Sequence, residues 1–79
     1  MSKYKVFDGV RMAVDKYESK GVPKGKVGTV LDIQDNGIAI GYTVEFYNPS
    51  NGETILLNTF PEEELELVEW EPQKDSKEQ

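Results

Sequence analysis

Six carboxylates gather near the end of the sequence, and they are the side chains best placed to do chemistry. Within ten residues the chain carries Glu62, Glu63, Glu64, Glu66, Glu69 and Glu71. Such a cluster can attract a basic protein surface or bind a divalent cation. The chain has no Asp-x-Asp-x-Asp-Gly loop of the kind that holds Ca²⁺, so we favour docking of a protein. The predicted partner-binding residues are Glu62, Glu63, Glu64, Glu66, Glu69 and Trp70.

The same glutamates have a purely structural interpretation. Acids are favoured in the first turn of a helix, and charged residues on a strand edge discourage aggregation. Trp70 has two interpretations as well, because tryptophan is enriched at binding hot spots but also covers the open end of a small barrel. These alternatives stay open at the level of the sequence.

Four lysines form a second candidate site in a polar stretch before the first long apolar segment. They are Lys16, Lys20, Lys24 and Lys26. Lysines of this kind bind nucleic acid phosphates through counterion release. They also keep a loop soluble and pair with nearby acids. Tyr17 lies among them, and we expect its ring to pack against the fold rather than to stack on a ligand.

The residues that the chain lacks exclude several classes of enzyme. Cysteine and histidine are both absent. Without them there is no disulfide, no thiol nucleophile, no zinc cluster of the usual kind, and no Ser-His-Asp or Cys-His triad. We therefore predict that the protein is not an enzyme and that it uses no cofactor and no metal.

Charge is divided unevenly along the chain. Residues 1–31 carry seven Lys/Arg and three acids, a net charge of +4, whereas residues 32–79 carry two lysines and twelve acids, a net charge of −10. An acidic surface repels nucleic acid and steers a basic partner toward it. We expect a basic protein as the partner, in an immunity-like, antitoxin-like or adaptor role. The alternative is binding of nucleic acid or ribonucleoprotein through the four loop lysines.

Nothing in the sequence predicts a membrane partner. No apolar run approaches the ~20 residues of a membrane span, and the N-terminal residues lack the apolar run of a signal peptide. We expect a cytoplasmic protein. Because small β-domains can pair their exposed strand edges, we expect a monomer or a weak homodimer.

Short strands separated by turns are the elements that must position these residues. Alternation of apolar and polar residues predicts strands at residues 10–14, 26–33, 38–47, 53–58 and 65–68. Turns are expected at 35–37 and 48–52, a long loop at 15–24, and one helical turn at 61–64. The predicted core is Met12, Val14, Val27, Val30, Ile33, Val44, Phe46, Leu57, Leu65 and Val68.

Five short strands leave exposed edges as a flat sheet, and curling them into a barrel removes those edges. The order of strand, long loop, three strands joined by tight turns, helical turn and final strand is that of an SH3-like barrel. We therefore predict an all-β fold, a five-stranded SH3-like barrel with one short helical turn before the last strand. The expected organisation is a loose N-terminus at 1–6, the barrel at 7–71 and a disordered tail at 72–79.

Particular residues support this fold through a family resemblance. The run Lys24-Gly25-Lys26-Val27-Gly28-Thr29-Val30 resembles the glycine-centred motif of KOW-type SH3-like barrels. With Tyr42-Thr43-Val44-Glu45-Phe46, Thr54-Ile55-Leu56-Leu57 and Pro61-Glu62-Glu63-Glu64-Leu65, the chain is similar to a family of short bacterial proteins of unknown function. The resemblance covers residues 7–68. It implies the barrel and no particular activity.

Overall fold

Five β-strands and two 3₁₀ turns make up the part of the chain that the structure, a computed structural model, describes, namely residues 2–68. The order along the chain is β1 (Gly9–Met12), η1 (Glu18–Lys20), β2 (Val27–Asp35), β3 (Ile40–Tyr47), β4 (Thr54–Pro61), η2 (Glu62–Glu64) and β5 (Leu65–Leu67). The prediction of five strands is thus confirmed, and so is that of a helical turn before the last one. The short η1 turn was not predicted.

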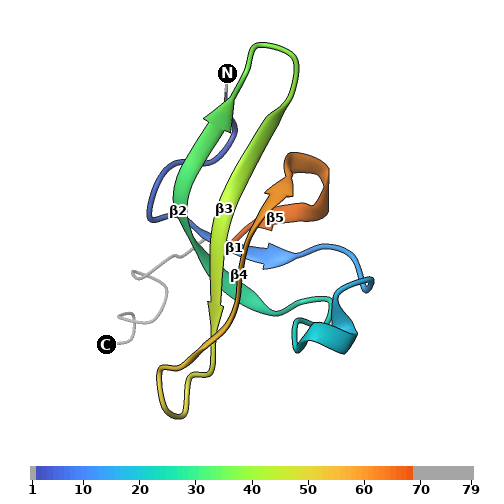
Figure 1. Ribbon diagram of the computed structural model, residues 1–79, viewed down its shortest axis with the longest axis vertical. Coiled ribbons are helices and arrows are strands. Elements are labelled where there is room, and N and C mark those ends of the chain that lie inside the picture. Colours follow the sequence, from blue (N-terminus) through green and yellow to red (C-terminus); the bar gives the residue numbers. More distant parts are fainter. Residues whose placement is uncertain (1, 69–79) are drawn as a thin grey trace, which may run out of the picture.

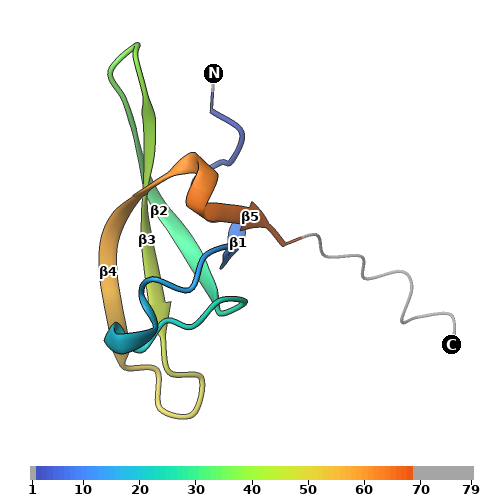
Figure 2. The same cartoon turned by 90° about the vertical axis from the view of Figure 1, so that its right-hand side faces the viewer.

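The strands form one antiparallel sheet in the order β4-β3-β2-β1-β5. Figure 1 shows β2 and β3 as the longest pair, with β4 beside β3 and β1 crossing near β5. In residues 2–68, β4 and β5 are the two outer strands of this order and do not pair with each other. The predicted closure into a barrel is therefore not found, because β4 runs into η2 and the three-residue β5 then pairs with β1 alone (Figure 2).

The alternation in β3 decides which face of the sheet is buried. Tyr42, Val44 and Phe46 have no exposed surface, and Ile40 packs against them from a partly buried position. Ile38, which shares their parity, was expected in the same strand, but it lies in the preceding turn with 93% of its surface exposed. The Asn36 side chain causes this, because its Oδ1 accepts hydrogen bonds from the Ile38 and Ala39 N–H groups and delays the strand.

The core differs from its predicted membership at several positions. It consists of Tyr4, Val10, Met12, Val22, Val30, Tyr42, Val44, Phe46, Phe60 and Leu65. Val27 and Leu57 were predicted inside but are about half exposed, since both lie on the opposite face of their strands from the buried residues. Val14 and Ile33 are partly buried. Tyr4, from a segment expected to be loose, is 3% exposed, and its hydroxyl donates to the Leu65 carbonyl at 3.0 Å.

Gly28 lies where two strands come closest. A Cβ atom there would lie 2.7 Å from the Glu45 carbonyl oxygen and 2.8 Å from the Phe46 ring. The two backbones therefore approach so closely that only glycine fits at this position. The bulge is a few residues further on, where the register of β2 against β3 shifts between Val30 and Asp32. None of the helical segments within residues 2–68 has the length and apolar character needed to cross a membrane.

Candidate functional site

Glu64 joins the acidic turn η2 to the long loop that carries the lysines. Its carboxylate accepts a hydrogen bond from the Tyr17 hydroxyl at 2.6 Å and forms an ion pair with Lys16 Nζ, also at 2.6 Å. The Tyr17 ring packs edge-on against Phe60, with centroids 5.0 Å apart. Glu64 is only 8% exposed. It therefore acts as a tether between η2 and the loop and presents little of its charge to a partner.

Glu62 has a corresponding role toward the N-terminal segment. The Tyr42 hydroxyl donates to its Oε2, and the Lys3 N–H donates to the same oxygen at 3.2 Å. The Tyr42 hydroxyl in turn accepts from the N–H groups of Lys3 and Tyr4, at 2.9 and 3.4 Å. The Tyr4 and Tyr42 rings lie 4.9 Å apart. Glu62 thus fixes the segment that delivers Tyr4 to the core.

These contacts move the pKa values of both pairs away from neutral pH. Hydrogen bonding from Tyr42 lowers the pKa of Glu62. For Glu64, burial alone raises the pKa, but the hydrogen bonds from Lys16 and Tyr17 outweigh it and lower the pKa. Burial, followed by the bond to its glutamate, raises the pKa of Tyr17 and Tyr42. A general acid or base works best with a pKa near the operating pH. Because the pKa values of these pairs are shifted away from neutral pH, the pairs are better suited to holding the fold together than to proton transfer.

The remaining predicted acids differ in their surroundings. Glu63 is exposed on η2. Glu66 faces the Arg11 Nε at 3.8 Å, in a surface ion pair whose side chains are 61% and 44% exposed. Glu69 and Trp70 lie outside the described residues. Within residues 2–68, Glu62 and Glu64 thus face internal partners, whereas Glu63 and Glu66 are exposed, so these four glutamates are not equally available to a partner.

The four loop lysines differ in their surroundings. Lys16 is tied to Glu64, and this contact raises the pKa of its ammonium group. Lys20 and Lys24 are exposed, and Lys26 is partly buried. Lys20 ends the η1 turn, whereas the Lys26 carbonyl accepts the Met12 N–H at 2.8 Å. The structure therefore shows one lysine of the four committed to an internal ion pair.

Carboxylates outside the predicted site lie on the open side of the sheet. This outer face, opposite the buried side chains of β3, carries Asp32 of β2, Thr43 and Glu45 of β3, and Leu57 and Thr59 of β4. Hydrogen bonds between Thr43 and Thr59 at 3.0 Å and from Thr43 to Gln34 at 3.1 Å confirm that these side chains share one face.

The charged side chains of β2, β3 and β4, the strands that carry the outer face, all have one sign. Residues 27–68, which span β2 to β5, contain eight Asp or Glu and neither Lys nor Arg; we call them the cation-free segment. Glu45 accepts from the Thr54 hydroxyl, and Asp32 accepts from the Ile33 N–H, so both are bonded only to neutral groups beside them. The sequence feature that indicates this face is the long run without lysine or arginine. The net charges of residues 1–31 and 32–79 do not reveal this run, because they divide the chain at another place.

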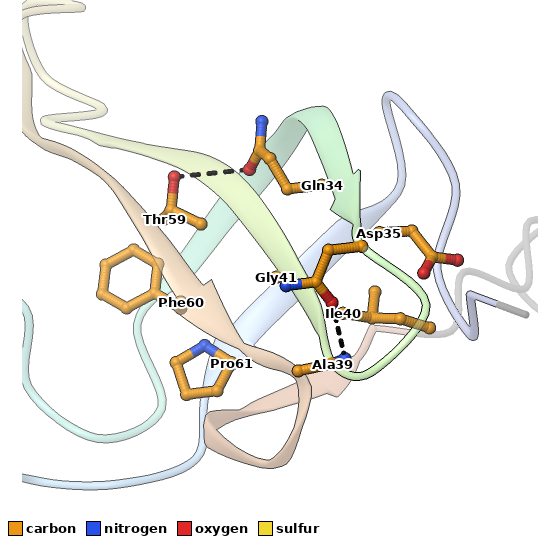
Figure 3. Close-up of a pocket in the computed structure, with 9 residues that line it drawn as sticks. Gln34, Asp35, Ala39, Ile40, Gly41, Thr59, Phe60 and Pro61 are labelled. Carbon is orange, nitrogen blue, oxygen red and sulfur yellow. Dashed lines mark hydrogen bonds between the residues drawn. The ribbon is translucent and has the colours of Figure 1, made fainter.

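A pocket of about 540 Å³ opens at the end of the β2–β3 hairpin. It lies between the turn at residues 36–39 and the end of β4, and Figure 3 shows Gln34, Ile40, Thr59, Phe60 and Pro61 around it. Gly41 contributes to the hollow, since a Cβ atom there would lie 2.9 Å from the Thr59 methyl group. The lining is mainly apolar, with two amides, one hydroxyl and the Asp35 carboxylate among its polar groups. Residues 2–68 contain no group of three or more metal-ligating side chains.

Comparison with known proteins gives one match, to a family model. Searches of curated proteins and of solved structures gave no match. Residues 6–67 match a domain of unknown function, DUF4926, which spans all five strands described above. The chain therefore belongs to the DUF4926 family, a family of unknown function.

Proposed function

We propose that this protein is a non-catalytic binding module that docks a basic protein partner. The observation that carries the proposal is the cation-free segment, in which all eight charged side chains are acidic. Such a surface raises the rate of association with a positively charged partner and suppresses acidic competitors. An immunity-like, antitoxin-like or adaptor role, in which a small acidic protein covers a basic surface, is the form that we propose for this docking.

The docking surface in this proposal is the outer face and not the whole glutamate cluster. Glu62 and Glu64 are held by tyrosine and lysine contacts, so using them for a partner would cost the fold those contacts. Asp32 and Glu45 are bonded only to neutral neighbours, and Glu45 lies opposite the exposed Leu57 across β3 and β4. Carboxylates next to an exposed apolar side chain suit a protein interface, which combines apolar contacts with a polar rim.

We further propose that the fold is an SH3-like sheet. The pairing of β1 with both β2 and β5, the long loop after β1 and the 3₁₀ turn before β5 support this assignment. The sheet order is open between β4 and β5, so the proposed relationship concerns strand order rather than barrel closure.

The test of the proposed function is affinity capture from a lysate of the protein's own host with three versions of the tagged protein. One is the wild type. The second neutralises the outer face and its border with Asp32→Asn, Glu45→Gln and Glu53→Gln, which retain hydrogen-bond acceptors. The third neutralises loop cations with Lys20→Gln, Lys24→Gln and Lys26→Gln. Bound protein and nucleic acid are both measured as salt is increased.

We expect a basic protein bound to the wild type and to the lysine variant, released by salt and lost from the acid variant. Circular dichroism of each version checks that the sheet is intact. Nucleic acid bound to the wild type and lost from the lysine variant would instead favour binding through the first loop. Equal capture by the wild type and the acid variant would contradict the proposal.

A further inference from the structure

β4 is an edge strand whose central residues lack the usual protection. It is eight residues long, Thr-Ile-Leu-Leu-Asn-Thr-Phe-Pro, and contains no charged residue. Natural sheets guard such edges with charges, bulges, short strands or covering elements. β5 at the other edge has only three residues and carries Glu66. Protective devices are confined to the ends of β4, where the register against β3 shifts at Ile55 and Pro61 ends the strand, and residues 56–60 between them have neither.

The backbone of β4 is available on its outer side. Across residues 2–68, backbone hydrogen bonds connect β4 to β3 alone. Figure 2 shows β4 as the outermost strand of the sheet, with the η1 region near its first residues. Leu57 is 54% exposed, and Asn58 and Thr59 beside it are also exposed. The centre of this edge is therefore open to a further strand.

One backbone donor of this edge is occupied by a neighbouring side chain. The Thr59 N–H donates to the Asn58 Oδ1 at 2.9 Å. This bond satisfies a group that an added strand would satisfy with a carbonyl oxygen. Because it is local and exposed, a strand can replace it at little cost, since one neutral hydrogen bond is exchanged for another.

We infer that β4 receives an extended, basic segment of the partner as a sixth strand of the sheet. The inference rests on the proposed function and specifies how the partner binds. Main-chain hydrogen bonds along β4 supply affinity, and Glu45, which lies opposite Leu57 on the adjoining β3, attracts lysine or arginine at the alternate residues of the segment that share its face. The apolar pocket beside Thr59, Phe60 and Pro61 lies at the end of the same strand and accommodates one apolar side chain.

Charge favours a basic segment over a second copy of this chain. Two copies paired antiparallel through β4 would bring Glu53, just before the strand, near Glu62 and Glu63, just after it, at both ends of the interface. Parallel pairing would place identical acids together. In either arrangement the cation-free segment offers no lysine or arginine to offset the repulsion. A basic segment meets the same carboxylates with opposite charge.

The test uses three peptides of the same length as β4. The first alternates lysine and valine, the second replaces each lysine by glutamate, and the third is the lysine peptide N-methylated at every second amide. Binding is followed by ¹⁵N–¹H NMR shifts of the full-length protein. We expect the lysine peptide alone to shift the amides of β4, with slower hydrogen exchange at Leu57 and Thr59 in the complex.

Two pairs of variants sharpen this test. Leu57→Lys is expected to weaken binding of the lysine peptide by about two- to fivefold relative to Leu57→Glu, since the two variants place charges of opposite sign at the same exposed position. Asn58→Ala frees the Thr59 N–H and is expected to tighten binding by about two- to tenfold, whereas Asn58→Ser, which retains a neutral acceptor oxygen, is not.

The outcomes separate this inference from the proposed function. Equal binding of the lysine peptide and its N-methylated form would overturn strand addition while leaving charge-based docking intact. Absence of binding by the lysine peptide at millimolar concentration would also overturn strand addition, and lysate capture would then decide the proposed function by itself. A dimer by sedimentation that the Leu57→Lys variant disrupts would assign the edge to a second copy and overturn the inference.

Discussion

Carboxylates in two regions of this molecule have different roles, although both regions belong to the cation-free segment. In η2, Glu62 and Glu64 bind tyrosine hydroxyls and tie the N-terminal segment and the long loop to the sheet. On the outer face, Asp32 and Glu45 accept hydrogen bonds only from neutral groups beside them. The comparison shows that density of acids along a sequence does not by itself locate a binding surface. Contacts determine which charges remain available to a partner.

The largest effect is expected from removing the buried carboxylate. Glu64→Ala leaves the Tyr17 hydroxyl without its acceptor and releases the loop, and we expect the free energy of unfolding to fall by about 1–3 kcal/mol. Urea denaturation followed by circular dichroism measures it. The matched control is Glu63→Ala at the neighbouring exposed position, with an expected change within about 0.5 kcal/mol. Equal losses in the two variants would remove the distinction between the regions.

A smaller loss is expected from Tyr42→Phe. This change removes the hydroxyl that connects Glu62 with the N–H groups of Lys3 and Tyr4, and such neutral hydrogen bonds contribute about 0.5–1.5 kcal/mol each. Hydrogen exchange at Lys3 and Tyr4 should accelerate more than exchange in β2 or β3. Tyr47→Phe on the exposed side of β3 is the control and should leave both amides unchanged. Unaltered protection in Tyr42→Phe would contradict the tethering role.

Acid pH tests both tethers together. The pKa values of Glu62 and Glu64 are lowered in the fold from an ordinary value of 4.5, so the fold favours their charged forms. This stabilisation is present above pH 4.5 and is lost as the pH falls through the lowered pKa values. We expect the free energy of unfolding to decline over that range in the wild type and less steeply in a Glu62→Gln/Glu64→Gln double variant. Parallel profiles would contradict the prediction.

The smallest effect on stability is expected on the outer face. Asp32→Asn and Glu45→Gln keep their acceptor oxygens, so thermal and urea unfolding should change by no more than about 0.5 kcal/mol each. The same variants should slow association with the basic partner, most clearly at low salt. A large loss of stability here would show that these acids also hold the fold.

The sequence predicts the strands well where alternation is long and unbroken. In β3, the parity of Tyr42, Val44 and Phe46 identifies the buried face. The prediction fails for Ile38 because a side-chain hydrogen bond from a turn asparagine overrides local apolar pattern. It misses Tyr4 because burial of that ring depends on Tyr42 and Leu65, which are far away in the sequence.

The candidate site is less predictable than the fold, for a physical reason. Whether Glu64 is buried depends on Tyr17 and Lys16, which reach it from a loop more than forty residues earlier in the chain. Local sequence shows only three consecutive acids. The absence of Lys and Arg from residues 27–68, by contrast, can be seen directly in the sequence. It indicates an acidic surface but does not specify the geometry of that surface.

The most direct test of this account is the association rate of the captured basic partner with two isosteric variants. One carries Asp32→Asn and Glu45→Gln on the outer face, and the other carries Glu63→Gln and Glu66→Gln at the exposed positions of the glutamate cluster. Both remove two charges. We predict that the outer-face variant associates several-fold more slowly and that the cluster variant stays close to the wild type. Slower association of the cluster variant, with the outer-face variant unchanged, would contradict the account.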